Sequence, residues 1–219
     1  MKLLLTSSGL TNKSIANALL ELTEKKPEET TVVFIPTASN VESGDKDWLI
    51  TDLINLKNQH FKSIEITDIS AVDENVWKPS LERADVLFFE GGNTYHLMRW
   101  LHKSGLNELL PQFLEDKVYV GVSAGSMVTS PDLSLKISQT IYEEDLVETK
   151  ELTGLNFVDF YFLPHLNSKW FPKVRRANVE MVGQEIGKPI YALDDNSALK
   201  IIDNTIEVIS EGEWFVVNE

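Results

Sequence analysis

The chain has 219 residues, of which 42% are hydrophobic, 25% charged and 9% aromatic. This composition is that of a globular protein with a proper core, and it excludes collagen-like, low-complexity and disordered chains. The 20 Lys and Arg residues stand against 34 Asp and Glu, and the resulting net charge of −14 would repel nucleic-acid phosphates and anionic membranes, so neither is expected as a partner.

The absence of cysteine excludes disulfides, thiolate metal sites and cysteine nucleophiles. The apolar run Leu3–Leu5 ends at Thr6, which is too short for a signal peptide, and no stretch is long enough for a membrane-spanning helix. We therefore expect a cytoplasmic protein. No repeat, linker or block of like charge marks a boundary, so residues 1–219 are expected to form one domain. A homodimer is compatible with the sequence, which fixes no oligomeric state.

Short apolar runs alternate with longer segments of helical periodicity along most of the chain. The expected strands are Lys2–Thr6, Thr31–Ile35, Ser63–Thr67, Val86–Phe89, Val118–Val122, Asp159–Leu163 and Pro189–Leu193. The expected helices are Ser14–Lys25, Asp47–His60, Thr94–Lys103, Leu106–Leu114 and Lys173–Ile186. This alternation is typical of parallel strands joined by crossover helices, and strands without polar alternation suit a sheet covered on both faces.

The last part of the chain has a different character. Three short runs, Ala198–Ile202, Thr205–Ile209 and Trp214–Val217, are separated by turn signals at Asp203-Asn204 and at 210–213. This pattern predicts a small antiparallel meander at the C-terminus.

The segment Gly121–Gly125 has the sequence G-x-S-x-G, directly after the apolar strand Val118–Val122 and before a segment that can open a helix. A nucleophilic serine on such a tight turn projects its hydroxyl from the strand end, and the backbone N–H of the next residue, Ala124, can face a developing oxyanion. The structural alternative is a glycine-rich turn that packs a helix closely on the sheet. By itself the motif indicates a candidate nucleophile, Ser123.

A second glycine-rich segment, Glu90–Thr94, follows the apolar strand Val86–Phe89. Two glycines at a strand end expose backbone N–H groups to a ligand, although Asn93 or Thr94 could equally serve as the N-cap of the following helix. Adjacent strand ends in an open α/β sheet line the same crevice, which is where such folds bind ligands.

A serine nucleophile needs a base, and the sequence has four histidines. His165 comes just after an apolar strand, where a loop can carry it over the crevice, whereas surface or packing roles explain His60, His96 and His102. A structural role for His165 is the alternative. A carboxylate must orient the imidazole, and Asp194-Asp195-Asn196 follows another strand, although such a run is often turn chemistry alone. The order Ser, His, Asp disfavours an ordinary α/β-hydrolase esterase.

Taken together, these motifs resemble the S51 serine peptidases, which include peptidase E (aspartyl dipeptidase) and cyanophycinase. The segments that carry the resemblance are Glu90–Thr94, Gly121–Ser126, Pro164-His165 and Leu193–Ala198. Their order, placement at strand ends and approximate spacing agree over residues 1 to 210. The resemblance implies a class I glutamine amidotransferase-like, flavodoxin-like α/β fold, with a mostly parallel sheet between helices and with no metal or organic cofactor.

The resemblance also implies the roles of individual residues. It makes Ser123 the nucleophile, His165 the general base and Asp195 the third triad member, with Asp194 and Asn196 as alternatives at that turn. The N–H groups of Gly92 and Ala124 match the oxyanion hole, and Asn93 lies beside it. Peptidase E relatives cleave dipeptides with an N-terminal Asp, so a cation should meet the substrate carboxylate. The expected cation is Arg175, with Arg176 as the alternative.

We therefore expect a serine exopeptidase for short peptides, most of all Asp-X dipeptides. The alternatives are a cyanophycinase-like or isoaspartyl hydrolase, a hydrolase of non-peptide acyl compounds, and a catalytically silent protein that binds small acidic ligands on the same fold.

Overall fold

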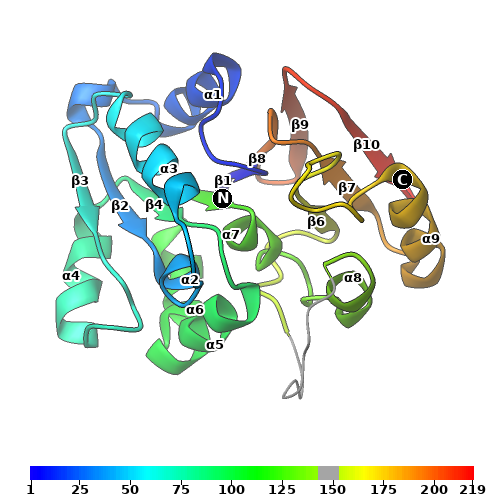
Figure 1. The fold of residues 1–219 in the computed structure, drawn as a ribbon. Coiled ribbons are helices and arrows are strands. Elements are labelled where there is room, and N and C mark those ends of the chain that lie inside the picture. The colour runs from blue at the N-terminus through cyan, green and yellow to red at the C-terminus, as the bar shows by residue number, and fades with distance from the viewer. Residues whose placement is uncertain (143–152) are drawn as a thin grey trace.

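A computed structural model describes residues 1–142 and 153–219 of the chain. Within these ranges, the main sheet has the strand order β3-β2-β4-β5-β1-β8-β9 (Figure 1). Its strands are β1 (Lys2–Thr6), β2 (Thr31–Ile35), β3 (Ser63–Ile66), β4 (Val86–Phe89), β5 (Val118–Val122), β8 (Ser197–Ile202) and β9 (Thr205–Ser210). The first five are parallel to one another, whereas β8 pairs antiparallel with β1 and β9 pairs antiparallel with β8.

Helices cover both faces of this sheet, which explains why its strands are apolar without alternation. Side chains from α1 (Lys13–Thr23) and α3 (Asp47–Lys57) pack with Phe34 and Phe88, whose rings stack 5.4 Å apart. On the other face, α4 (Glu74–Arg83), α5 (Thr94–Ser104) and α6 (Leu106–Phe113) pack with Phe89 and Tyr119. Successive residues of a strand point to opposite faces, so each strand contributes to both cores.

A second, smaller sheet lies beside the first, with the order β10-β7-β6 (Figure 1). It consists of β6 (Tyr161–Leu163), β7 (Ile190–Leu193) and β10 (Trp214–Val217). Strand β7 is parallel to β6 and antiparallel to β10. The helices α8 (Leu135–Thr140) and α9 (Arg176–Ile186) contribute to the core around this sheet, which contains Leu163 and Leu166. Short helical turns at α2 (Thr37–Asn40), α7 (Ala124–Met127) and Pro27–Glu29 complete the described elements.

The predicted strands all form, with ends within two residues of the expected ones. The predicted meander is correct for β8 and β9, but β10 leaves it and pairs with β7. Helix α9 begins at Arg176 rather than at Lys173, because Arg175 has an extended backbone with φ −132°. Helices α4 and α8 were not expected from the sequence. Among the described residues, no helix combines the length and apolar character that crossing a membrane requires.

Candidate active site

The candidate site lies where the neighbouring strands β4, β5 and β1 end. These strands are parallel and in register, so Phe89 pairs with Gly121 and Thr6 pairs with Val122. The residues that follow each strand therefore emerge at one edge of the sheet. There, a Cβ atom added to Gly91 would lie 3.3 Å from the Ser123 Cβ, which shows how closely the turn after β4 and the turn after β5 approach each other.

Ser123 occupies a tight turn between β5 and α7. Its backbone has φ 46° and ψ −105°, a conformation that non-glycine residues rarely adopt and that the surrounding structure must hold in place. Its N–H donates to the Thr6 carbonyl at 3.0 Å. Gly125 lets α7 pass directly over β4, since a Cβ at this position would lie 2.2 Å from the Phe89 carbonyl oxygen. The G-x-S-x-G spacing thus produces the strained turn that exposes a serine hydroxyl.

The imidazole of His165 lies between Ser123 and Asp195. Its Nε2 is 2.9 Å from the Ser123 Oγ, and its Nδ1 is 2.7 Å from the Asp195 Oδ1. His165 follows β6 in a left-handed backbone conformation with φ 68°, and Asp195 lies in the turn between β7 and β8. The structure therefore brings together three residues that are 42 and 30 positions apart, in the order hydroxyl, imidazole, carboxylate.

Two further side chains hold the imidazole, and sequence reasoning missed both. The Ser7 hydroxyl donates to the Asp195 Oδ1 at 3.0 Å and accepts the His165 backbone N–H at 2.8 Å. The ring of Phe171 stacks on the imidazole, with centroids 4.4 Å apart and planes within 8°. The sequence could have indicated Ser7, because this residue follows β1 at the same edge of the sheet as Ser123. No sequence pattern could have indicated Phe171.

The environment of Asp195 favours its ionised form. Partial burial raises the pKa of Asp195, but the hydrogen bond and charge of His165, with the Ser7 hydroxyl, outweigh burial, and the net effect lowers this pKa. The neighbouring Asp194 is engaged elsewhere. Its carboxylate accepts the Ser197 hydroxyl at 2.6 Å and the Glu213 N–H at 2.7 Å, so it holds the turn together. Of the two adjacent carboxylates, Asp195 is the one that meets the imidazole.

The backbone N–H groups of Gly92 and Ala124 donate to no acceptor within residues 1–142 and 153–219. Gly92 has φ 125°, and a Cβ there would lie 2.4 Å from the Ala38 carbonyl oxygen, so only glycine fits. The Gly91 N–H, in contrast, is bonded to Glu90 Oε1 at 2.9 Å. Asn93 caps α5, because its Oδ1 accepts the His96 N–H at 2.8 Å, which leaves its amide NH₂ group for other contacts.

The two candidate arginines have different surroundings. The Arg175 guanidinium donates to the carbonyls of Ser168, Phe171 and Val174, at 2.8 to 3.1 Å, and so ties together the loop that carries Phe171. The Arg176 guanidinium lies 4.0 Å over the ring of Phe215 and pairs with Glu180 at 3.4 Å.

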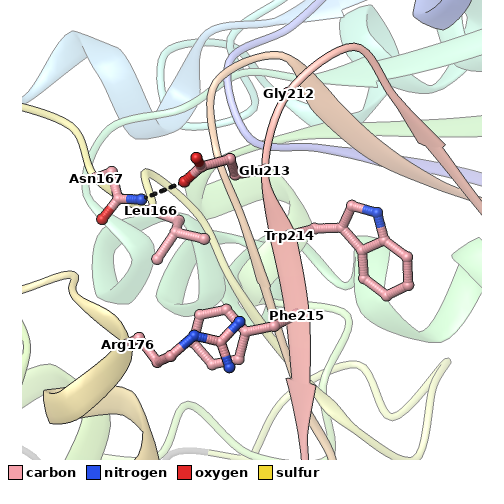
Figure 2. A pocket seen from close by; sticks show the side chains of 7 residues that line it. All are labelled: Leu166, Asn167, Arg176, Gly212, Glu213, Trp214 and Phe215. Carbon is pink, nitrogen blue, oxygen red and sulfur yellow. Dashed lines mark hydrogen bonds between the residues drawn. The ribbon is translucent and has the colours of Figure 1, made fainter.

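A pocket of about 430 Å³ is lined by Leu166 and Asn167, which follow His165 in the chain, by Arg176 and by residues 212–215, whereas Ser123, His165 and Asp195 do not line it. Figure 2 shows Arg176 and Phe215 side by side at this pocket. The Trp214 side chain extends from strand β10 on the side of the strand opposite to Arg176. Asn167 donates to the Glu213 carboxylate at 2.8 Å across the rim of the pocket. The described residues contain no group of three or more His, Asp or Glu side chains arranged to hold a metal ion.

Replacing Ser7 with Ala is expected to lower catalytic turnover, because it removes the hydroxyl that fixes both Asp195 and the His165 backbone. A hydrogen bond to a charged group contributes about 1.5–3 kcal/mol, which corresponds to about 10- to 100-fold in rate. The kcat of the purified Ser7→Ala variant measures this effect. Ser14→Ala is a suitable control, since Ser14 bonds to the exposed Glu211. Equal kcat values for Ser7→Ala and the unmodified protein would contradict the assignment.

Known proteins resemble this chain over most of its length. The family model of Peptidase family S51 matches residues 3–209. An uncharacterized peptidase of Pasteurella multocida is 28% identical over 184 residues, which are 83% of this chain and 86% of that one. Another uncharacterized peptidase, from Listeria innocua, is 31% identical over 191 residues, which are 84% and 86% of the two chains.

Peptidase E of Shewanella oneidensis is 28% identical over 157 residues, which are 68% of this chain and 64% of that one. A crystal structure of a Listeria monocytogenes protein, provisionally named a peptidase E, matches with a TM-score of 0.79 and 27% identity. This match covers 96% of this chain and 98% of the other, and it confirms the expected flavodoxin-like α/β fold.

Proposed function

Because the chain belongs to peptidase family S51, a family of serine peptidases, we propose that it hydrolyses short peptides, above all dipeptides with an N-terminal Asp, through Ser123, His165 and Asp195. The observation that supports this proposal most is the position of the His165 imidazole, 2.9 Å from a serine hydroxyl and 2.7 Å from a carboxylate. This arrangement makes a serine nucleophilic at neutral pH.

In the first half of the proposed reaction, the neutral His165 accepts the Ser123 proton at Nε2 while Oγ attacks the scissile carbonyl carbon. Asp195 accepts the Nδ1–H, which fixes the tautomer with a free Nε2 and stabilises the imidazolium that forms. The C–N bond of the tetrahedral intermediate then breaks, and His165 returns the proton to the departing amine. The product of this half is the Asp ester of Ser123.

In the second half, water replaces the amine. His165 takes a proton from the water, the hydroxide attacks the ester carbonyl, and the proton returns to the Ser123 Oγ as the acid leaves. In both halves the negative charge on the carbonyl oxygen needs donors. We assign this role to the N–H groups of Gly92 and Ala124, which have no acceptor within the described ranges.

The acidic side chain of the substrate needs a cation, and two arginines compete for this role. Three of the Arg175 bonds go to loop carbonyls, which favours a supporting role in placing Phe171. Arg176 lines the pocket whose wall includes Leu166 and Asn167, and its partner Glu180 is half-exposed, so a substrate carboxylate can take the place of this weak surface ion pair. Within the proposed function, Arg176 is therefore the favoured cation and Arg175 the alternative.

A panel of Asp-X, isoAsp-X and neutral X-X dipeptides tests the proposal. We expect Asp-X to have the highest kcat/KM. Arg176→Gln should reduce kcat/KM for Asp-X by about 10- to 100-fold, mainly through KM, and leave neutral dipeptides nearly unchanged, because a charge-assisted hydrogen bond contributes about 1.5–3 kcal/mol. The matched control is Arg99→Gln, on helix α5.

The other outcomes of the panel identify the alternatives. Activity on isoAsp-X alone would indicate an isoaspartyl or cyanophycinase-like hydrolase. Activity only on simple esters or amides would indicate a non-peptide acyl hydrolase. If every substrate is left intact, the proposed activity is wrong.

A further inference from the structure

A pair of buried carboxyl groups that the proposed mechanism does not use lies behind the candidate site. Glu90 directly follows β4 and is fully buried, and Asp52 on the inner side of α3 is 7% exposed. The two carboxyl groups lie close enough for each to shift the pKa of the other. Two carboxylates can only accept hydrogen bonds, so a direct bond between them requires one of the groups to carry a proton. Among the described residues, Glu90 Oε2 is buried and has no hydrogen-bond partner, which leaves it available to share a proton with Asp52.

Burial and mutual repulsion both oppose the loss of this proton. Burial raises the pKa of Asp52 to about 7, and burial together with the Asp52 charge raises the pKa of Glu90 well above its ordinary value. The charge of Asp195 also raises the pKa of Asp52, and the partner of Asp195 is His165. Raised pKa values mean that the folded state holds protons that the unfolded chain releases. The pair therefore stabilises the fold fully below the ordinary pKa values of 3.8 and 4.5, and this contribution falls as the pH rises through about 7.

The pair touches the two loops that flank Ser123. Glu90 Oε1 accepts the Gly91 N–H at 2.9 Å, and Gly91 lies against Ser123. On the other side, Asp52 packs on Gly9, where an added Cβ would lie 2.6 Å from the Asp52 Oδ1. Gly9 belongs to the loop after β1 that also carries Ser7. The pair thus contacts both the turn with the candidate oxyanion donor and the loop with the hydroxyl that orients Asp195.

The bond from Gly91 to Glu90 decides which backbone donor remains available. Because the Gly91 N–H points to Glu90, it cannot serve a substrate, and the next donor along the turn is Gly92. The Gly92 backbone is held from the other side, since Asn93 donates its N–H to the Ala38 carbonyl at 3.0 Å. Fixing both neighbours fixes the direction of the Gly92 N–H.

We infer that Glu90 and Asp52, joined by one proton, are positioning residues that orient the Gly92 N–H toward the carbonyl oxygen of the substrate. This inference rests on the proposed function of Ser123 and Gly92. The proton keeps the pair together, so the turn keeps its shape as long as one member remains neutral. When both are ionised, two buried like charges repel each other and the Gly91 anchor shifts.

The test compares Glu90→Leu, Glu90→Gln and the unmodified protein. Leu cannot accept the Gly91 N–H, so we expect kcat to fall by about 10²-fold, comparable to removing one oxyanion donor, with little change in KM. Gln accepts the same N–H and donates its NH₂ to an ionised Asp52, so Glu90→Gln should recover most of the kcat. It should also lack the alkaline decline in kcat that the unmodified protein shows when Glu90, whose pKa is raised well above its ordinary value, loses the last proton of the pair.

Two additional measurements keep the result decisive. The infrared carbonyl stretch of a protonated carboxyl group should be present in the unmodified protein at pH 8 and absent in Glu90→Gln. The control is Asp68→Asn, since the Asp68 carboxylate at the end of β3 accepts the Thr37 hydroxyl and has a lowered pKa. This control should keep both the infrared band and the alkaline decline.

The outcomes separate this inference from the proposed function. An unmodified protein that cleaves no dipeptide rejects the proposed function, and with it the inference. An active protein without the infrared band, or a folded Glu90→Leu variant with unchanged kcat, overturns the inference alone. If Glu90→Leu fails to fold, the alkaline decline decides the matter, and its persistence in Glu90→Gln contradicts the inference.

Discussion

Replacing Ser123 with Ala is expected to lower the kcat for Asp-X dipeptides by about 10⁴-fold or more, the largest effect of any single substitution in this chain. The hydroxyl is the only group at this position that can form the ester, and the imidazole cannot replace it. The free energy of unfolding should change by only about 1 kcal/mol, because the variant loses one hydrogen bond to a side chain. Steady-state kinetics and chemical denaturation measure the two quantities.

Ser126→Ala is the matched control for this variant. Ser126 lies three residues further along the same motif, and its hydroxyl donates to the Thr6 carbonyl at 2.9 Å. We expect this variant to lose a similar amount of stability and to keep its activity. Comparable activity losses in Ser123→Ala and Ser126→Ala would mean that the motif has only a structural role.

Replacing Asp195 with Asn is expected to lower kcat by about 10³- to 10⁴-fold with the fold intact. The amide NH₂ of Asn would donate to Nδ1 of His165, which places the proton on Nε2, the nitrogen that must accept the Ser123 proton. The geometry would survive, but the imidazole would be in the wrong tautomer. The kcat at neutral pH measures the loss.

Asp194→Asn should show the opposite behaviour. The Asp194 carboxylate accepts hydrogen bonds from Ser197, Asn196 and Glu213 in its own turn. An amide cannot accept all of them, so we expect the free energy of unfolding to fall by about 1–3 kcal/mol. The kcat should stay within about tenfold of the unmodified value, given that this carboxylate does not contact His165. A larger kcat loss in Asp194→Asn than in Asp195→Asn would reverse the assignment of the third residue.

Much of the fold could be predicted because its strands are short apolar runs and its crossover helices have clear periodicity. The prediction failed where local pattern and tertiary contacts disagree. Helix α4 was missed because it contains Pro79 and is mostly polar, and it depends on burying Trp77 and Leu81. The partner of β10 could not be predicted either, since a strand pattern carries no information on pairing. Strand β10 joins β7 from Trp214 to Val217.

The candidate site shows the same division. Gly121–Gly125 and Glu90–Thr94 could be predicted to lie together, because residues that follow parallel strands emerge at one edge of the sheet. The turn at Asp195 follows β7 of the smaller sheet, so this argument does not place it. The position of Ser7 after β1 could have been used in the same way, although its contacts with Asp195 and His165 could not be predicted. The contacts of Phe171 and Asp52 could not be predicted either, because each is a single side chain without a motif, and its role arises only from the residues that folding places against it.

The start of helix α9 bears directly on the substrate cation. The apolar periodicity predicted a helix from Lys173, but the chain turns until Arg175, whose guanidinium binds three carbonyls of that turn. An arginine that satisfies a loop cannot be distinguished by sequence from one that faces a ligand. The adjacent Arg176 lines the pocket together with Leu166 and Asn167, and the proposal that it is the substrate cation depends on this contact, which the sequence does not show.

The central claim is that the Ser123 hydroxyl, activated by His165, attacks the acyl carbon. The most direct measurement is mass spectrometry of the protein after reaction with a fluorophosphonate, which forms a stable bond only with an activated serine. We predict one adduct per chain, located on Ser123 by peptide mapping and lost in the His165→Gln variant. An unlabelled protein, or labelling that spreads over Ser7 and Ser126 as readily as over Ser123, would contradict it.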